Sequence, residues 1–256
     1  DQNVAIGFES LKTEDTGSRN TAVGAYTLNV LNNDALSYNT AIGYASGLSV
    51  TTGTNNTLIG GLAGDAITTG GDNVSIGFSS LSSTTTATNN SAVGTYALNV
   101  NTTGGSNVAM GYNALGANTT ASNNTAIGTS ALTLNTTGTG NTAVGQGAGA
   151  AVTTGTNNTI VGKLAGDAIT TGDANVAIGE DALSSTTTAD SNVAIGQGAM
   201  EANTTGASNV AVGSAALDAN TTASNNTAVG KSALTTNTTG TDNTAVGGHA
   251  GAGNTT

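Results

Sequence analysis

The chain has 256 residues, with no cysteine, proline or tryptophan, 38 glycines and a formal net charge of −11 at pH 7. The lack of cysteine excludes disulfides and thiolate metal sites, and a single histidine, His249, excludes a histidine cluster. Four scattered basic residues cannot neutralise a line of phosphates, so no nucleic-acid partner is expected. No apolar run is long enough to span a bilayer, so we expect no membrane insertion in this segment.

A short unit repeats along the whole sequence. Its consensus is N-[TV]-A-[VI]-G-x-x-A-[LG]-x-x-x-T-T-[GA]-x-x, and its glycine recurs fifteen times, from Gly7 to Gly247. Thirteen of the fourteen spacings between these glycines are 17 residues and one is 19. A block of six units is itself duplicated, as residues 39–140 and 141–242. The pattern predicts a single repetitive domain over residues 1–256.

Each unit opens with the pentapeptide N-[TV]-A-[VI]-G, which predicts a five-residue strand bounded by turn formers. Asparagine tolerates the left-handed region, and its amide can bond the copies above and below it in a ladder. This predicted structural ladder consists of Asn3, Asn20, Asn39, Asn56, Asn73, Asn90, Asn107, Asn124, Asn141, Asn158, Asn175, Asn192, Asn209, Asn226 and Asn243. In the strand, the alanine suits a narrow interior and the branched residues point outward. The glycine is expected to have a positive φ or to permit close backbone approach.

Two variable residues follow the glycine, and aromatic side chains gather there in the first half of the chain. They are Phe8, Tyr26, Tyr44, Phe78, Tyr96 and Tyr112. The same positions elsewhere hold charged or amide side chains, which predicts that the rings face solvent. Exposed rings could stack on sugars or contact a neighbouring fibre, and packing of the rings across a turn is an equally open interpretation.

The rest of the unit supplies the interior and a second corner. Most units have a large apolar residue four positions after the glycine. Where that residue is itself glycine, as at Gly47 and Gly64, an apolar residue appears three positions later, at Val50 and Ile67. The volume is conserved, as a packed core requires. With the Thr-Thr segment as a second short strand, each unit makes one turn of an all-β parallel β-solenoid, giving about fifteen turns.

The repeat resembles the head repeats of trimeric autotransporter adhesins and the NTAVG-rich repeats of phage tail fibres, over all fifteen units. The resemblance implies a left-handed β-roll, three chains per fibre and attachment at a bacterial or virion surface. A strand that is apolar on both faces also favours a covering partner, and identical copies are the simplest one, so we expect a homotrimer. The 17-residue unit is longer than the adhesin turn. No stalk or anchor is visible, so we expect a fragment of a longer fibre.

No catalytic, cofactor or metal site is expected, and the chain is not predicted to be an enzyme. Asp65 and Asp167 are equivalent copies in the duplicated block, and the adjacent Glu180 and Asp181 suit a solvated surface. The nonapeptide of calcium-binding β-rolls is absent. Sequons recur by position, which geometry explains better than glycosylation does; they include Asn101, Asn118, Asn135, Asn203, Asn220 and Asn237.

The expected function is a structural and adhesive fibre, extracellular or on a virion surface, which acts as a spacer. Its expected partners are further copies of itself and a glycan or protein of a host surface. Two alternatives stay open. One is a filament that assembles end to end. The other is an ice-binding solenoid that uses the Thr-Thr pairs from 51–52 to 255–256, although adjacent residues would leave one threonine per turn facing out.

Overall fold

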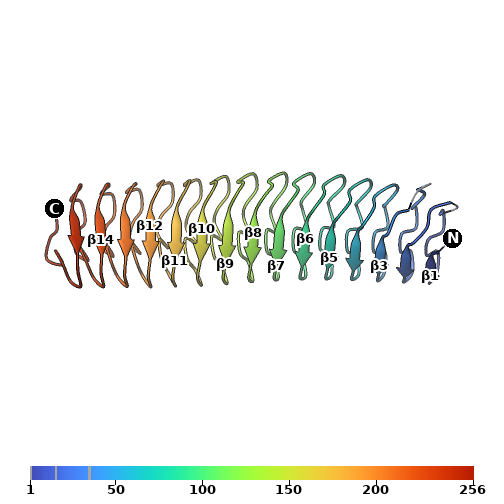
Figure 1. Cartoon of the computed structure of the whole chain (residues 1–256), viewed down its shortest axis with the longest axis horizontal. Coiled ribbons are helices and arrows are strands. Elements are labelled where there is room, and N and C mark those ends of the chain that lie inside the picture. Colours follow the sequence, from blue (N-terminus) through green and yellow to red (C-terminus); the bar gives the residue numbers. More distant parts are fainter. Residues whose placement is uncertain (1, 15, 34–35) are drawn as a thin grey trace. The chain divides into compact units, whose positions relative to one another are not determined.

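The computed structural model describes residues 2–14, 16–33 and 36–256. The fold is an all-β parallel β-solenoid of about 14 turns of about 17 residues, and the described residues contain no helix. The chain divides into two compact units, Asp1–Asn124 and Thr125–Thr256. Within each unit, successive turns stack in chain order (Figure 1).

Each repeat unit contributes one strand, and a strand is present at all fifteen predicted places. Each has three residues and not the predicted five, because the asparagine before it and the positive-φ glycine after it lie outside the strand. The first unit contains β1 (Val4–Ile6), β2 (Thr21–Val23), β3 (Thr40–Ile42), β4 (Thr57–Ile59), β5 (Val74–Ile76), β6 (Ser91–Val93) and β7 (Val108–Met110). The second contains β8 (Thr125–Ile127), β9 (Thr142–Val144), β10 (Thr159–Val161), β11 (Val176–Ile178), β12 (Val193–Ile195), β13 (Val210–Val212), β14 (Thr227–Val229) and β15 (Thr244–Val246). Inside each unit every strand pairs in parallel with the next one.

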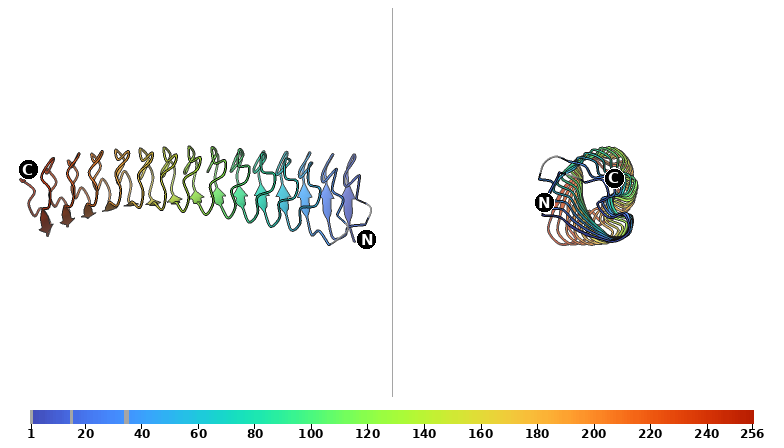
Figure 2. Two further views of the ribbon diagram at one scale, coloured as in Figure 1. Left: turned by 90° about the horizontal axis from the view of Figure 1, so that it is seen from above. Right: turned by 90° about the vertical axis from the view of Figure 1, so that its right-hand side faces the viewer.

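The strands line one side of the turns, and irregular segments form the other side (Figure 2). The middle residue of each strand, usually alanine, points into the turn; from β2 to β14 it is buried. The glycine that ends each strand has a positive φ, as predicted, for example +135° at Gly7. A Cβ on Gly7 would lie 2.4 Å from the carbonyl oxygen of Gly24 in the next turn. Only glycine therefore allows the turns to stack at this corner.

The segment after the glycine enters the left-handed region at the second and fourth residues, even where the fourth is leucine. Leu98 has φ +51°, and Ala97 and Leu98 are both fully buried. In an extended strand, adjacent side chains point to opposite faces. The left-handed leucine breaks that alternation and lets both side chains enter the core. Its strain is offset by burial and by backbone hydrogen bonds, such as Leu98 N–H to the Ala114 carbonyl at 3.1 Å.

The predicted exchange of volume across the core is confirmed. Val50 and Ile67 are fully buried. A Cβ on Gly64 would lie 2.8 Å from Ile67 Cδ1 and 2.8 Å from Leu58 Cδ2, so neighbouring apolar side chains already fill the space that leucine occupies in other turns. Packing is complete in both kinds of turn.

The prediction of a second strand at the Thr-Thr segment is wrong. The N–H groups of Thr51, Thr52 and Gly53 all donate to the carbonyl oxygen of Thr68, at 2.9, 3.3 and 3.2 Å. Amides that converge on one carbonyl make a bend instead of the regular ladder of a strand. Each turn therefore has one strand and an irregular remainder.

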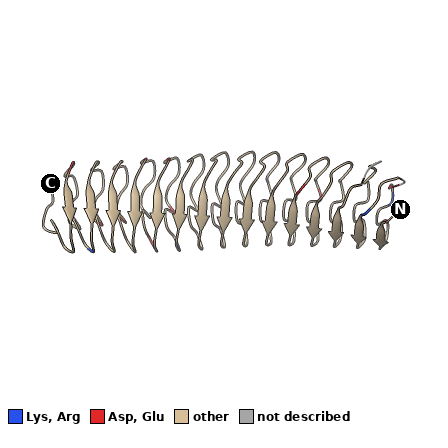
Figure 3. Cartoon of the chain, viewed as in Figure 1, with Lys and Arg blue, Asp and Glu red and all other residues tan. Residues whose placement is uncertain are grey.

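Charged residues are few and lie at separate points on the turns (Figure 3). The two ion pairs of the described residues join Lys12 to Glu9 at 2.8 Å and Lys163 to Glu180 at 3.1 Å, on the surface. No helix suited to crossing a membrane occurs in the described ranges.

Candidate functional site

The repeated asparagine that precedes each strand forms a hydrogen-bonded ladder within each unit. Its Oδ1 accepts the backbone N–H of the next asparagine, at 2.9 to 3.1 Å. Its Nδ2 donates to a carbonyl at the second corner of its own unit, 14 residues further along the chain, for example from Asn39 to Gly53 at 2.7 Å. From Asn20 to Asn226 these side chains are buried. The ladder is a structural element with no surface to offer a ligand.

A second asparagine ladder runs through the core at the position seven residues after the glycine. In the first unit, Asn118 Nδ2 donates to Asn101 Oδ1 at 2.8 Å; in the second, Asn220 Nδ2 donates to Asn203 Oδ1 at 2.9 Å. These side chains are fully buried, so the sequons that they head are not open to a modifying enzyme in the folded chain. Sequence reasoning missed the ladder, although its position also holds the core residues Val50 and Ile67.

The six aromatic residues after the glycine lie in the first unit and form two groups of three. Ring centroids are 5.4 Å apart for Phe8 and Tyr26 and 5.9 Å apart for Tyr26 and Tyr44. In the second group, Phe78 to Tyr96 is 5.8 Å and Tyr96 to Tyr112 is 6.2 Å. All four contacts are edge to face. We call these six rings the aromatic stripe.

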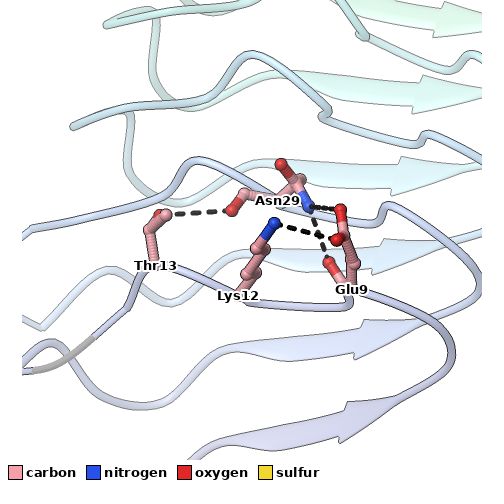
Figure 4. Close-up of polar contacts among 4 residues, drawn as sticks. All are labelled: Glu9, Lys12, Thr13 and Asn29. Carbon is pink, nitrogen blue, oxygen red and sulfur yellow. Dashed lines mark hydrogen bonds and ion pairs between the residues drawn. The ribbon is translucent and has the colours of Figure 1, made fainter.

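Glu9 follows the first ring of the stripe and is held by its neighbours (Figure 4). Lys12 pairs with its Oε1 at 2.8 Å, and Asn29 Nδ2 donates to its carbonyl at 2.9 Å. Thr13 Oγ1 in turn donates to the Asn29 carbonyl at 3.1 Å. The negative charge beside Phe8 is therefore already paired, and the stripe itself is neutral.

The outward residues of the strands form a second surface, which we call the strand face. It comprises the first and third residue of each strand, and these positions hold only Val, Ile, Thr, Ser and Met. None of these side chains is buried; among the third residues, Ile42 is 39% exposed and Ile195 is 36% exposed. The strand face is therefore an uncharged, partly aliphatic surface in both units.

The acidic residues do not assemble into a site. No group of three His, Cys, Asp or Glu side chains that could hold a metal ion occurs in the described residues. Burial raises the pKa of Asp65 and of Asp167 above 3.8, and backbone hydrogen bonds offset this only in part. Asp181 adds a smaller like-charge repulsion that also raises the pKa of Asp167. Each of the two carboxylates has its Oδ1 buried without a hydrogen-bond partner.

The second threonine of the Thr-Thr segment is exposed in every turn that has the pair, and the first is exposed as well at Thr102, Thr238 and Thr255. The first threonine donates its hydroxyl to the next turn, for example Thr153 Oγ1 to the Thr170 carbonyl at 3.1 Å. The second, such as Thr154 and Thr171, is exposed. These exposed residues, one in each of thirteen turns, form a threonine column.

No protein-family model matches the chain, and no curated protein or solved structure is significantly similar to it.

Proposed function

We propose that this chain is a rod segment of an extracellular or virion surface fibre, in which three copies associate through the strand face. The observation that carries the proposal is that face: every strand presents an apolar third residue that stays partly exposed, and no charged side chain interrupts the face in either unit. The third strand residues thus form an exposed apolar row in each unit, and exposed apolar surface of this kind is typical of a protein interface. A copy of the same repeat would match it turn for turn.

The ladders support a mechanical role. Both the strand pairing and the asparagine ladder continue from turn to turn within each unit. Stability is then a sum over neighbouring turns, which suits a spacer whose length is set by the number of repeats. The resemblance of the repeat to trimeric adhesin heads and phage tail fibres points to the same role and to attachment at a surface.

The mass of the protein in solution tests the association. A homotrimer of the 24.4 kDa chain has a mass of about 73 kDa, three times the chain mass. We expect the double variant Ile178→Lys with Val212→Lys to give 24.4 kDa monomers, because each lysine ammonium would be desolvated in the interface. The matched control, Thr188→Lys with Thr222→Lys, adds the same charge at exposed positions of the threonine column and should stay trimeric.

Sedimentation equilibrium on the three proteins separates the outcomes. A wild-type monomer would refute association through the strand face. A broad distribution of masses that grows with concentration would instead indicate a filament that assembles end to end. Equal dissociation of the variant and the control would show that added charge acts generally, and not through this face.

Ice binding is a second candidate, and the exposed threonine column favours it. An array of hydroxyl and methyl groups at the spacing of one turn could order water. We expect Thr137→Lys, Thr154→Lys and Thr171→Lys together to abolish any inhibition of ice recrystallisation that the wild type shows at micromolar concentration. A wild type without that inhibition removes this candidate.

A further inference from the structure

The aromatic stripe alternates with a period of two turns. The residue directly after the glycine is aromatic in the first, third, fifth and seventh turns: Phe8, Tyr44, Phe78 and Tyr112. In the turns between, that residue is Ala25, Gly61 or Thr95, and the large side chain moves one position on, to Tyr26, Leu62 or Tyr96. The second unit has no aromatic residue at either position. The alternation is therefore a particular feature of the first unit and not a property of the repeat.

The rings directly after the glycine are the most exposed ones of the stripe. Phe8 is 65% exposed, Tyr44 61%, Phe78 48% and Tyr112 54%. The intervening rings, Tyr26 and Tyr96, are less exposed and contact their neighbours edge to face.

The backbone fixes the register of these rings. The N–H of Tyr26 donates to the Phe8 carbonyl at 2.8 Å, and the N–H of Tyr96 donates to the Phe78 carbonyl at 3.1 Å. The edge-to-face contacts with Tyr26 and Tyr96 limit the rotation of the exposed rings, so these rings lose little freedom when a ligand stacks on them.

The spacing matches an extended polysaccharide. Two turns of a parallel sheet advance by roughly 10 Å. In a β-1,4-linked glucan or chitin chain, successive sugars face opposite ways, so the same face recurs once per disaccharide. The length of one disaccharide is about equal to the advance over two turns of the solenoid. Pyranose rings present apolar C–H faces that suit aromatic stacking. The four exposed rings can therefore meet four successive disaccharides.

Charge points to a neutral ligand. The one acidic side chain beside the exposed rings, Glu9, is paired with Lys12. No basic side chain adjoins the other three exposed rings in sequence, and the chain's net charge of −11 would repel an acidic polymer. Tyr44 and Tyr112, which are exposed, also have hydroxyls that can bond sugar hydroxyls.

We propose that the aromatic stripe of the first unit binds neutral β-1,4-linked polysaccharide, such as cellulose or chitin, by stacking Phe8, Tyr44, Phe78 and Tyr112 on every second sugar. This inference deepens the attachment part of the proposed function and does not depend on the strand face. A protein that is trimeric but leaves these polysaccharides unbound would refute this inference alone.

The test is depletion of the full chain from solution by microcrystalline cellulose and by chitin, with granular starch, an α-linked glucan, as the comparison. We expect binding to the β-1,4-linked polymers and at least tenfold weaker binding to starch. Each of Phe8→Ala, Tyr44→Ala, Phe78→Ala and Tyr112→Ala should weaken binding by about three- to tenfold, and the quadruple variant should not bind. Tyr38→Ala is the matched control, because Tyr38 is an exposed tyrosine of the same unit outside the stripe.

A register variant tests the spacing itself. Tyr44→Ala combined with Gly61→Tyr keeps four rings but moves one of them by a single turn. Gly61 tolerates a side chain, since an added Cβ would make only an ordinary 3.5 Å contact with Phe78 Cδ2. We expect this variant to bind as weakly as Tyr44→Ala, with an unchanged far-UV circular dichroism spectrum.

Several results would overturn the proposal. They are the absence of wild-type binding to both polymers, equal losses for Tyr38→Ala and the stripe variants, and full binding by the register variant. A change in mass caused by the stripe variants without any change in polysaccharide binding would assign the stripe to contact between copies of the chain instead.

Discussion

Replacing Asn175 with alanine tests the energetic role of the asparagine ladder. Its buried side chain accepts the backbone N–H of Asn192 at 3.0 Å and the Asn192 Nδ2 at 3.3 Å. It donates to Asn158 Oδ1 at 3.2 Å and to the Ala189 carbonyl at 2.8 Å. Alanine leaves the Asn192 N–H and the Ala189 carbonyl buried without these partners. Each of these two groups costs about 1–3 kcal/mol, so we expect a destabilisation of about 2–6 kcal/mol.

The assay combines urea denaturation, followed by circular dichroism, with hydrogen exchange of the peptide that ends at Asn192. Because each turn contacts only its neighbours, exchange should accelerate most in the turns beside residue 175. Asn157→Ala is the control: Asn157 is exposed, and Ala174 has the equivalent place in the next turn with φ +56°. A loss for Asn175→Ala no larger than for this control would refute the ladder's role in stability.

Three further predictions concern the core. Gly64→Ala should lower the unfolding free energy by about 1–3 kcal/mol through overpacking against Leu58 and Ile67; Gly248→Ala, where a Cβ meets nothing within 4 Å, should leave the urea midpoint unchanged. Asn220→Val should be destabilising alone, because Asn203 Oδ1 loses its donor. Replacing Asn203, Asn220 and Asn237 together with valine should be nearly neutral in the same assay, because carbonyls such as that of Gly206 still accept a hydrogen bond, here from Asn192 Nδ2. A triple variant less stable than the single variant would contradict this. Burial raises the pKa of Asp65 in the folded state. The contribution of Asp65 to the free energy of unfolding is therefore most favourable below its unfolded-state pKa of about 3.8, and it is lost as the pH rises through the folded-state pKa. The gain in thermal midpoint from Asp65→Asn should therefore be larger at pH 7 than at pH 3.5, and an equal gain at both would contradict the raised pKa.

Much of the fold could be predicted because the same short sequence pattern, with the same local structural preference, occurs in fifteen units. The pentapeptide N-[TV]-A-[VI]-G recurs at a nearly constant spacing, so fifteen units together support a strand there more strongly than a single unit would. The exchange between Gly64 and Ile67 was also readable, since a packed interior must conserve volume. The strand face and the exposed rings could be expected from the residue types beside the glycine.

What the sequence did not determine lies in the irregular part of each turn. The burial of Asn220 is indicated in the sequence only by its place in the repeat, which Val50 and Ile67 also occupy, and nothing in the sequence shows that Leu98 adopts a left-handed conformation. These outcomes depend on where the carbonyl groups of the adjacent turn lie. Because three backbone amides donate to the one carbonyl of Thr68, the Thr-Thr segment cannot form the regular hydrogen bonds of a second strand. The period and the strand were set by local sequence. The inner asparagine ladder and the bracing of alternate rings were decided by contacts between turns, because those contacts alone determine which side chains are buried.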